Sequence, residues 1–388
     1  MVTPAKAGAQ PLDPRSGGDD SSAAFVKTFP CGGCGAKLTF APGTRTLKCE
    51  FCGHVNDIPD AGDARVEELD FDTYLKALEG KQETHEAQHV RCDQCGAEQN
   101  LPENVFADKC TFCGANIVAK SYANRLVKPK ALVPFTIERR QAQDDFRKWV
   151  KGLWLAPGEL KRYAESDAAV TGSYLPFWTY DCRTSTDYTG ERGEDYYTNE
   201  TREFTNDKGE TVTRTERVKH TNWTPASGHV DCFHDDVLVL ASNTLPRELR
   251  GATAVWDLKR LVPYQPEFVS GYRAEAYQVG LSQGFPLAKE QIDSRIYGLV
   301  RQDIGGDQQR VHQLNTRYSE IKFKHVLLPV WVSAYRFRNK TYRFLVNGQT
   351  GEVAGESPLS WQKVTWLVVG IILLVIIALV LSSAGHHR

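Results

Sequence analysis

Apolar and polar positions follow two regular patterns in the second and last thirds of the chain. Helical spacing is seen around Phe146 and Val150 and again over residues 292–304, which predicts two amphipathic helices. Between residues 331 and 353 apolar positions alternate with polar ones around turn sequences such as Arg338-Asn339-Lys340, which is typical of antiparallel strands. Together these patterns predict an α+β fold rich in antiparallel strands.

Two short sequences occur twice in this part of the chain. They are Leu132-Val133-Pro134-Phe135 with Leu261-Val262-Pro263-Tyr264, and Tyr174-Leu175-Pro176-Phe177-Trp178 with Leu327-Leu328-Pro329-Val330-Trp331. A helical pattern precedes the Pro-x-Trp of each copy, and strand sequence follows it. The repetition predicts a duplicated α+β body with a first half at 121–260 and a second half at 261–357.

A different pattern occupies residues 364–384, which are almost wholly apolar and carry no charge. As a helix these 21 residues would extend about 31 Å, close to the hydrocarbon thickness of a bilayer. Lys363 precedes the run, and Trp361 and Trp366 lie at its start, where indoles prefer the membrane interface. A buried core helix would normally keep a polar face. We therefore expect a single-pass C-terminal membrane anchor embedded in the lipid bilayer.

Eight of the ten cysteines occur in two copies of one frame. Each copy has two Cys-x-x-Cys-Gly hooks with fourteen residues between them, and each cysteine of the second copy follows its counterpart by 61 positions. The first copy contains Cys31, Cys34, Cys49 and Cys52, and the second contains Cys92, Cys95, Cys110 and Cys113. Four thiolates match the ligand number of a tetrahedral structural Zn²⁺ and leave no open position. Disulfides or a redox pair would not account for the repeated frame.

The spacing therefore predicts two zinc ribbons, at 28–57 and 91–120, each holding one structural zinc ion. Segments this short bury too little apolar surface to fold alone, so the metal must stabilise them. Between the ribbons, 58–90 reads as an acidic linker with a short helix capped by Asp72. Residues 1–27 are rich in Ala, Gly, Pro, Ser and Asp and are expected to form a disordered leader.

Charge and targeting signals restrict the setting of the protein. The 388 residues carry a net charge of −1, and no secretory signal sequence is recognisable at the start. Zinc thiolates belong to a reducing compartment, so we expect the N-terminal body in the cytoplasm. Residues 1–120 carry 18 acidic and 12 basic side chains, and two four-thiolate zinc sites would take this region from −6 to −10. That sign disfavours nucleic acid, which is bound by cations, and leaves a local basic face as the alternative.

Two short motifs are typical of catalysis, but their surroundings are not. His85-Glu86-Ala87-Gln88-His89 matches a zinc-protease pattern within a polar linker, where we expect a solvated helix face. Gly280-Leu281-Ser282-Gln283-Gly284 matches a nucleophile elbow but reads as a turn before a helix starting near Pro286. Cys182 and Cys232 read as buried, inert thiols. Since no phosphate-binding Gly-x-x-x-x-Gly-Lys-[Ser/Thr] occurs either, we expect a protein that is not an enzyme.

The chain resembles a family of bacterial membrane-associated proteins with a TFIIB-type zinc ribbon. Besides the two cysteine frames, the resemblance rests on Tyr174-Leu-Pro-Phe-Trp-Thr-Tyr180, Tyr188-Thr-Gly-Glu-Arg-Gly193, Asp303-Ile-Gly-Gly-Asp307, Phe323-Lys-His-Val-Leu-Leu-Pro-Val-Trp331 and Val346-Asn-Gly-Gln-Thr-Gly351. Some members accompany PspA-like and flotillin-like membrane-stress proteins, which implies an adaptor role. Such sequences are also labelled primosomal replication-restart helicase, a likeness that rests only on paired four-cysteine sites.

These observations predict a membrane-anchored adaptor or scaffold that acts by binding other proteins, in membrane stress or maintenance. The alternative is a membrane-tethered nucleic-acid-binding protein without an ATPase motor.

Overall fold

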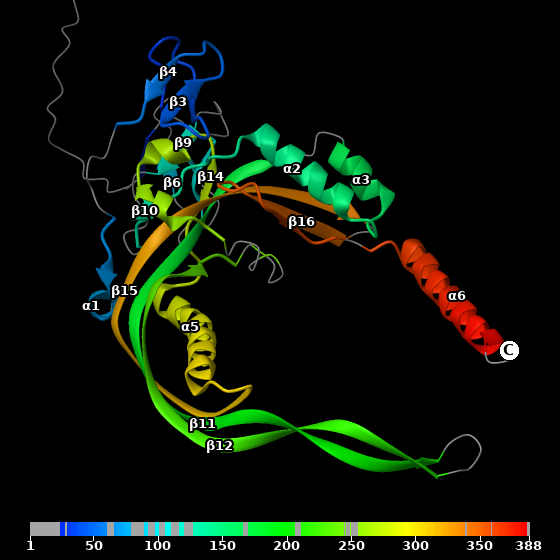
Figure 1. The fold of residues 1–388 in the computed structure, drawn as a ribbon. Coiled ribbons are helices and arrows are strands. Elements are labelled where there is room, and N and C mark those ends of the chain that lie inside the picture. Colours follow the sequence, from blue (N-terminus) through cyan, green and yellow to red (C-terminus); the bar gives the residue numbers. More distant parts are fainter. Residues whose placement is uncertain are drawn as a thin grey trace, which may run out of the picture.

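The computed structural model describes residues 24–27, 29–59, 66–78, 89–91, 98–100, 105–109, 116–119, 127–165, 170–205, 211–243, 245, 249, 255–337, 340–357 and 359–385. As predicted, they form an α+β fold in which most strand pairs are antiparallel, and the chain ends in a long apolar helix (Figure 1).

The body is built on two long neighbouring strands, β11 (Thr171–Thr205) and β15 (Gln308–Phe337), which pair antiparallel. Its remaining strands are β10 (Ala131–Leu132), β12 (Thr211–Leu240), β13 (Val262–Pro263), β14 (Arg273–Glu275), β16 (Lys340–Asn347) and β17 (Val353–Gly355). Its helices are α2 (Arg139–Gly152), α3 (Gly158–Glu165) and α5 (Leu281–Ile304), with short 3-10 turns η2 (Leu258–Arg260) and η3 (Pro266–Val269). Both predicted helices and the predicted strands after Trp331 are present.

Two β-α-β-β units face each other across the β11–β15 pair. The first contains β10, α2, β11 and β12, and the second contains β14, α5, β15 and β16. β10 runs parallel to β15, and β14 runs parallel to β11 in the same register. Tyr174 pairs with Pro329 and Pro176 pairs with Leu327, so the two Pro-x-Trp copies lie antiparallel about a local two-fold. The pairing makes β14 the counterpart of β10. The second copy of the Leu-Val-Pro sequence, at 261–264, lies instead in and around β13, which pairs with β10.

The two tryptophans of this repeat hold the helices of the opposite units. The Trp178 indole N–H donates to the carbonyl of Val279, just before α5, over 2.8 Å. The Trp331 indole N–H donates to the carbonyl of Ile137, just before α2, over 3.0 Å. Each tryptophan therefore fixes the start of the other unit's helix and satisfies its own buried N–H.

Alternate residues of the central strands pack on opposite faces of the sheet. Tyr174, Trp178 and Trp331 face the helices, where they join the apolar stripes of α2 and α5. Leu175 and Leu328 point the other way, into a core shared with Leu245, Leu249 and the segment around η2. Since both faces are covered, the central strands are apolar on both sides at this point.

β11 and β12 continue well beyond the core as a curved hairpin arm (Figure 1). β15 accompanies β11 as far as Gly193, and the two strands of the arm then run on alone to Thr205 and Thr211. The pairings slip next to Asp181, and two residues there, Asp236 and Glu320, have positive φ angles. These bulges add curvature where the sheet leaves the body.

The N-terminal strands form two groups. β2 (Leu38–Phe40), β3 (Thr46–Cys49) and β4 (Val55–Asp57) form a small sheet within residues 28–57, here called the first cysteine module. β6 (His89–Arg91), β7 (Glu98–Asn100), β8 (Val105–Lys109) and β9 (Asn116–Ala119) belong to the second cysteine module, residues 91–120 with the adjoining β6. β1 (Ala24–Lys27) pairs with β9 and β6, so the end of the expected leader is a strand.

The linker holds β5 (Leu69–Asp70) and α1 (Phe71–Leu78), so the expected short helix is present. Its cap is not Asp72, because the Asp70 carboxylate accepts the Thr73 N–H over 2.8 Å and Asp72 already lies in the first turn. At the other end, α6 (Trp361–Gly385) contains the predicted apolar run. Its window from Trp361 to Ala378 is long and apolar enough to cross a membrane, and none of it is buried against the body.

Candidate metal centre and the adjoining groove

Both hooks of the first cysteine module turn back through a glycine. Gly35 and Gly53 have φ angles of +69° and +74°, and their N–H groups donate to the carbonyls of Cys31 and Cys49. Glycine adopts this left-handed conformation without strain. The tight turns bring the thiols of Cys31 and Cys34, and of Cys49 and Cys52, toward one point.

The four sulfurs form a compact cluster. All of them lie within 4.8 Å of one another, with Cys31 Sγ 3.5 Å from Cys52 Sγ and Cys34 Sγ 3.6 Å from Cys49 Sγ. Four sulfurs around a zinc ion at about 2.3 Å would be about 3.8 Å apart. Cys31 and Cys49 are buried, and Cys34 and Cys52 are exposed. This cluster could therefore hold one metal ion.

The surroundings of the cluster lower the pKa of one thiol, Cys49, and raise that of another, Cys52. A hydrogen bond from the backbone N–H of Cys52 lowers the pKa of Cys49 to about 7. Cys52 also accepts a backbone hydrogen bond, from His54, but the neighbouring thiols of Cys34 and Cys31 raise its pKa to about 12. Thiols this close resist ionising together, and a divalent cation between them removes that opposition.

The second set of cysteines, Cys92, Cys95, Cys110 and Cys113, lies outside the described residues, but the strands around it repeat the first module. β3 pairs with β4 through Thr46–Asp57, Leu47–Asn56 and Lys48–Val55. β8 pairs with β9 through Ala107–Val118, Asp108–Ile117 and Lys109–Asn116, each 61 positions later. The bridge between Pro30 and Lys37 is likewise matched by the pair Arg91–Glu98. The two modules thus share strand register around their cysteines.

The first module is joined to the body by its own backbone. Phe40 packs its ring 5.3 Å from that of Phe268, and its N–H donates to the carbonyl of Ser270. The carbonyl of Leu38 accepts from both Ser270 Oγ (3.0 Å) and the Asn116 side-chain amide (2.8 Å). Asn116 belongs to β9, so the second module also contacts this junction.

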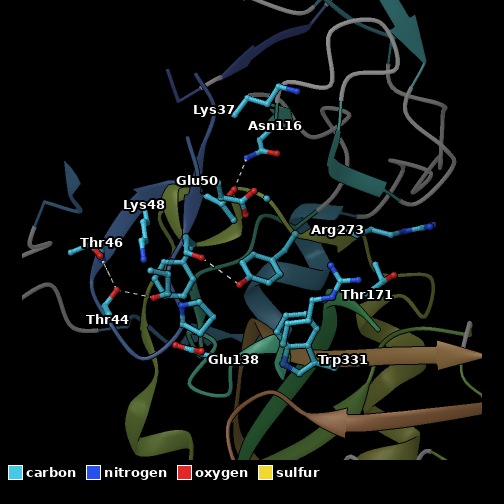
Figure 2. Close-up of a pocket in the computed structure, with 18 of the residues that line it drawn as sticks. Lys37, Thr44, Thr46, Lys48, Glu50, Asn116, Glu138, Thr171, Arg273 and Trp331 are labelled. Atoms are coloured by element: carbon cyan, nitrogen blue, oxygen red, sulfur yellow. Dashed lines mark hydrogen bonds between the residues drawn. The ribbon is translucent and has the colours of Figure 1, made fainter. Parts of the chain in front are cut away.

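A groove of about 910 Å³ lies between the first module and the body. Figure 2 shows Lys48 and Glu50 from the module, with Arg273, Thr171 and Trp331 from the body. Its lining also includes Lys37, Phe51, Val55, Asp108, Glu138, Arg139 and Tyr272. Phe51, in the second hook, is 78% exposed. The groove thus combines exposed apolar side chains with charges of both signs, and none of the sequence patterns pointed to it.

The catalytic-looking motifs have ordinary positions. His89 starts strand β6, so the expected helix face does not continue to the end of His85–His89; residues 85–88 lie outside the described part of the chain. α5 begins at Leu281, before the expected start near Pro286, and Ser282 is exposed in its first turn. Cys182 is buried, and burial raises its pKa to about 11, but Cys232 is half-exposed rather than buried.

The Asp303–Asp307 segment forms the end of helix α5 and the turn that follows it. α5 ends at Ile304, and Gly305 and Gly306 follow with positive φ angles. Asp303 accepts a 2.5 Å hydrogen bond from the Tyr188 hydroxyl, and Asp307 accepts the N–H of Asp195. These contacts attach the helix end to β11, which gives this motif a structural role.

Comparisons with known proteins place the chain beside one relative. It is 28% identical over 352 residues to the uncharacterized protein YdjG of Bacillus subtilis (strain 168), a match that covers 88% of this chain and 92% of that protein. No protein-family model matches the chain, and no solved structure matches it. The likeness to YdjG covers most of both chains, and YdjG is itself described as uncharacterized.

Proposed function

We propose that the protein is a membrane-anchored zinc-ribbon adaptor that acts by binding other proteins. Each cysteine module holds one structural zinc ion, the first through Cys31, Cys34, Cys49 and Cys52 and the second through the four cysteines 61 positions later. The observation that carries the first ion is the sulfur cluster, with spacings close to those of a zinc tetrahedron. The repeated register of β8 and β9 supports the second.

The zinc ions are structural in this proposal, because four cysteine ligands leave no position for a water molecule. The ribbons serve instead to build one wall of the groove. An exposed phenylalanine beside fixed charges of both signs suits a partner segment that inserts an apolar anchor and is oriented by complementary charge. The resemblance points to PspA-like or flotillin-like membrane proteins as such partners.

α6 anchors the adaptor in the bilayer, and the body lies on the cytoplasmic side. The length and the uniformly apolar surface of α6 support a membrane span. The thiolate chemistry of the modules supports the cytoplasmic side, because an oxidising compartment would turn the hooks into disulfides.

The experiment compares partner recovery by full-length wild type, Phe51→Ala and Phe233→Ala from solubilised membranes of the native cells. Phe233 is a matched control, since it is also exposed but lies on the body, away from the groove. We expect membrane-associated proteins to be recovered at least tenfold less with Phe51→Ala, as for an aromatic interface anchor, and normally with Phe233→Ala. Equal recovery with both variants would contradict the groove as the binding site.

Nucleic acid is the second candidate, and one observation favours it: Lys37, Lys48, Arg139 and Arg273 all line the groove. Glu50, Glu138 and Asp108 line it as well, which offsets most of that charge. We expect no binding of DNA or RNA to full-length protein at physiological salt. Sub-micromolar binding that falls steeply with added salt, and that is lost on replacing Lys48 and Arg273, would establish this function in place of the adaptor.

A further inference from the structure

The loop between α2 and α3, residues 153–157, is attached to the first turn of α6. The Lys363 ammonium donates to the carbonyls of Trp154 (3.0 Å) and Ala156 (2.7 Å), and the N–H of Ser360 donates to the carbonyl of Leu155 (2.9 Å). Three hydrogen bonds thus join a loop of the body to the start of the apolar helix, over 200 positions later in the chain. We call this segment the Trp154 loop.

Trp154 presents its indole to the outside at this junction. Its side chain is 60% exposed, as Trp361 (73%) and Trp366 (76%) are on α6, whereas Trp178 and Trp331 in the body are buried. Trp154 and Trp366 line a common apolar groove of about 650 Å³ with Leu367, Gly370, Ile371 and Leu374. An indole exposed to water gains no free energy from burial of its apolar surface. At the membrane interface the ring can be buried while its N–H still finds a hydrogen-bond acceptor.

Charges around the loop have the sign that suits anionic lipid. Between residues 148 and 163 the chain carries four basic side chains and one acidic, namely Lys148, Lys151, Lys161, Arg162 and Glu159. Lys151 is exposed at the end of α2 that leads into the loop, and the exposed Lys148, one turn earlier, pairs with Asp145 over 3.2 Å. Lys363 uses two of its three N–H donors on the loop carbonyls, which leaves one for an external acceptor such as a lipid phosphate.

We infer that the Trp154 loop is a second membrane contact, seated in the interface of the leaflet where α6 enters, among anionic phospholipid headgroups. Trp154 inserts its indole beside Trp366, and Lys363 joins the loop carbonyls to a lipid phosphate. This rests on the proposed membrane span of α6. The two contacts together hold the body in a fixed orientation relative to the bilayer.

The test uses full-length protein labelled with 5-fluorotryptophan in nanodiscs of phosphatidylcholine and phosphatidylglycerol. Each ¹⁹F resonance is assigned by a Trp→Phe variant, and lipids with a nitroxide near the headgroup are then added. We expect the resonances of Trp154, Trp361 and Trp366 to be lost by broadening, while those of Trp178 and Trp331 persist. In discs of phosphatidylcholine alone, the Trp154 resonance should be broadened less; equal broadening would overturn the role of anionic headgroups.

Lys363→Gln removes the ammonium, and Lys363→Arg retains a positive donor. With Lys363→Gln the Trp154 resonance should return while that of Trp366 stays lost, and with Lys363→Arg both should stay lost. A sharp Trp154 resonance in wild type beside a lost Trp366 resonance would overturn this inference and leave the anchor in place. Sharp resonances for all three residues would overturn the proposed membrane span as well.

Discussion

The first cysteine module buries Leu38, Phe40 and Leu47 as its large apolar side chains, whereas α5 alone buries six, from Leu281 to Ile304. The remaining buried groups of the module include the thiols of Cys31 and Cys49. The body has an aromatic core of tilted and edge-on rings around Trp178, Trp331 and their neighbours. We therefore expect two regions of one chain that share an interface to be stabilised in different ways: the module by the zinc ion proposed for its cysteines, and the body by packing.

The largest expected effect is loss of the metal. Cys49→Ser should remove zinc from the first module and with it most of the roughly 10–16 kcal/mol of apparent binding energy typical of such sites. We expect metal content to fall by one equivalent and residues 29–59 to become protease-sensitive, while the body resists digestion. Cys232→Ser, a half-exposed thiol of the body, is the control and should keep all its metal. Unfolding of the body together with the module would contradict separate stabilisation.

The converse change acts on the body. Trp178→Ala removes a fully buried indole and its hydrogen bond to Val279 and should lower the free energy of unfolding by about 3–5 kcal/mol. Zinc content should remain unchanged. Tyr196→Ala, half exposed on the hairpin arm, should change the stability by less than about 0.5 kcal/mol. Urea unfolding and metal analysis of the same samples make the comparison, and zinc loss in Trp178→Ala would contradict it.

A smaller effect comes from a buried ionic cluster of the body. Asp181 is 2% exposed and lies near Lys324, Asp236 and Glu68; burial raises its pKa to about 7 from an ordinary 3.8. Between these pH values the folded protein keeps a proton that the unfolded chain has lost. This contribution to stability is therefore complete below about pH 4 and is lost as the pH rises through 7.

The variant Asp181→Asn cannot titrate, so its stability should fall less between pH 5 and pH 7, by a difference of about 2–3 kcal/mol. Urea unfolding monitored by tryptophan fluorescence at both pH values measures this. Glu320→Gln, exposed beside Arg183, should behave as wild type. The prediction is wrong if wild type and Asp181→Asn have the same pH slope.

Two glycines of α5 distinguish packed from open positions on one helix. A Cβ at Gly284 would lie 2.5 Å from the Tyr180 hydroxyl and 2.9 Å from Trp178 Cδ1, so Gly284→Ala should cost about 1–3 kcal/mol. A Cβ at Gly298 would have no atom within 4 Å outside the helix's own backbone, and Gly298→Ala should stabilise the helix by about 0.5–1 kcal/mol. Thermal unfolding of both variants checks the pair; equal shifts would show that the helix face is not packed as described.

Some sequence patterns were reliable because their meaning is local. The apolar stripe of α2 and the alternation of the strands after Trp331 each involve residues a few positions apart, and the structure has them as expected. The predicted turn at Arg338-Asn339 lies outside the described residues. Local patterns also failed where two neighbours compete. Asp70 and Asp72 are both able to cap a helix, and only the geometry of the Thr73 N–H selects Asp70.

The Pro-x-Trp repeat was the most informative nonlocal signal, since it marked the strands that pair about the local two-fold. The sequence did not indicate the extent of the arm, because β-propensity does not say how far a strand of mostly polar residues continues. It also gave no sign of the groove beside Phe51, whose walls come from residues far apart in the chain.

By itself the sequence determined the cysteine frame with its repeat of 61, the helices α2 and α5, the strand character after each Pro-x-Trp, and an apolar C-terminal helix long enough for a bilayer. These follow from spacing and composition, which fix ligand number, periodicity and length. Only the tertiary structure decided how the two units pair, where Asp181 is buried, and which carbonyls Lys363 reaches. Those features depend on contacts between residues tens to hundreds of positions apart, and such contacts form only when the whole core packs.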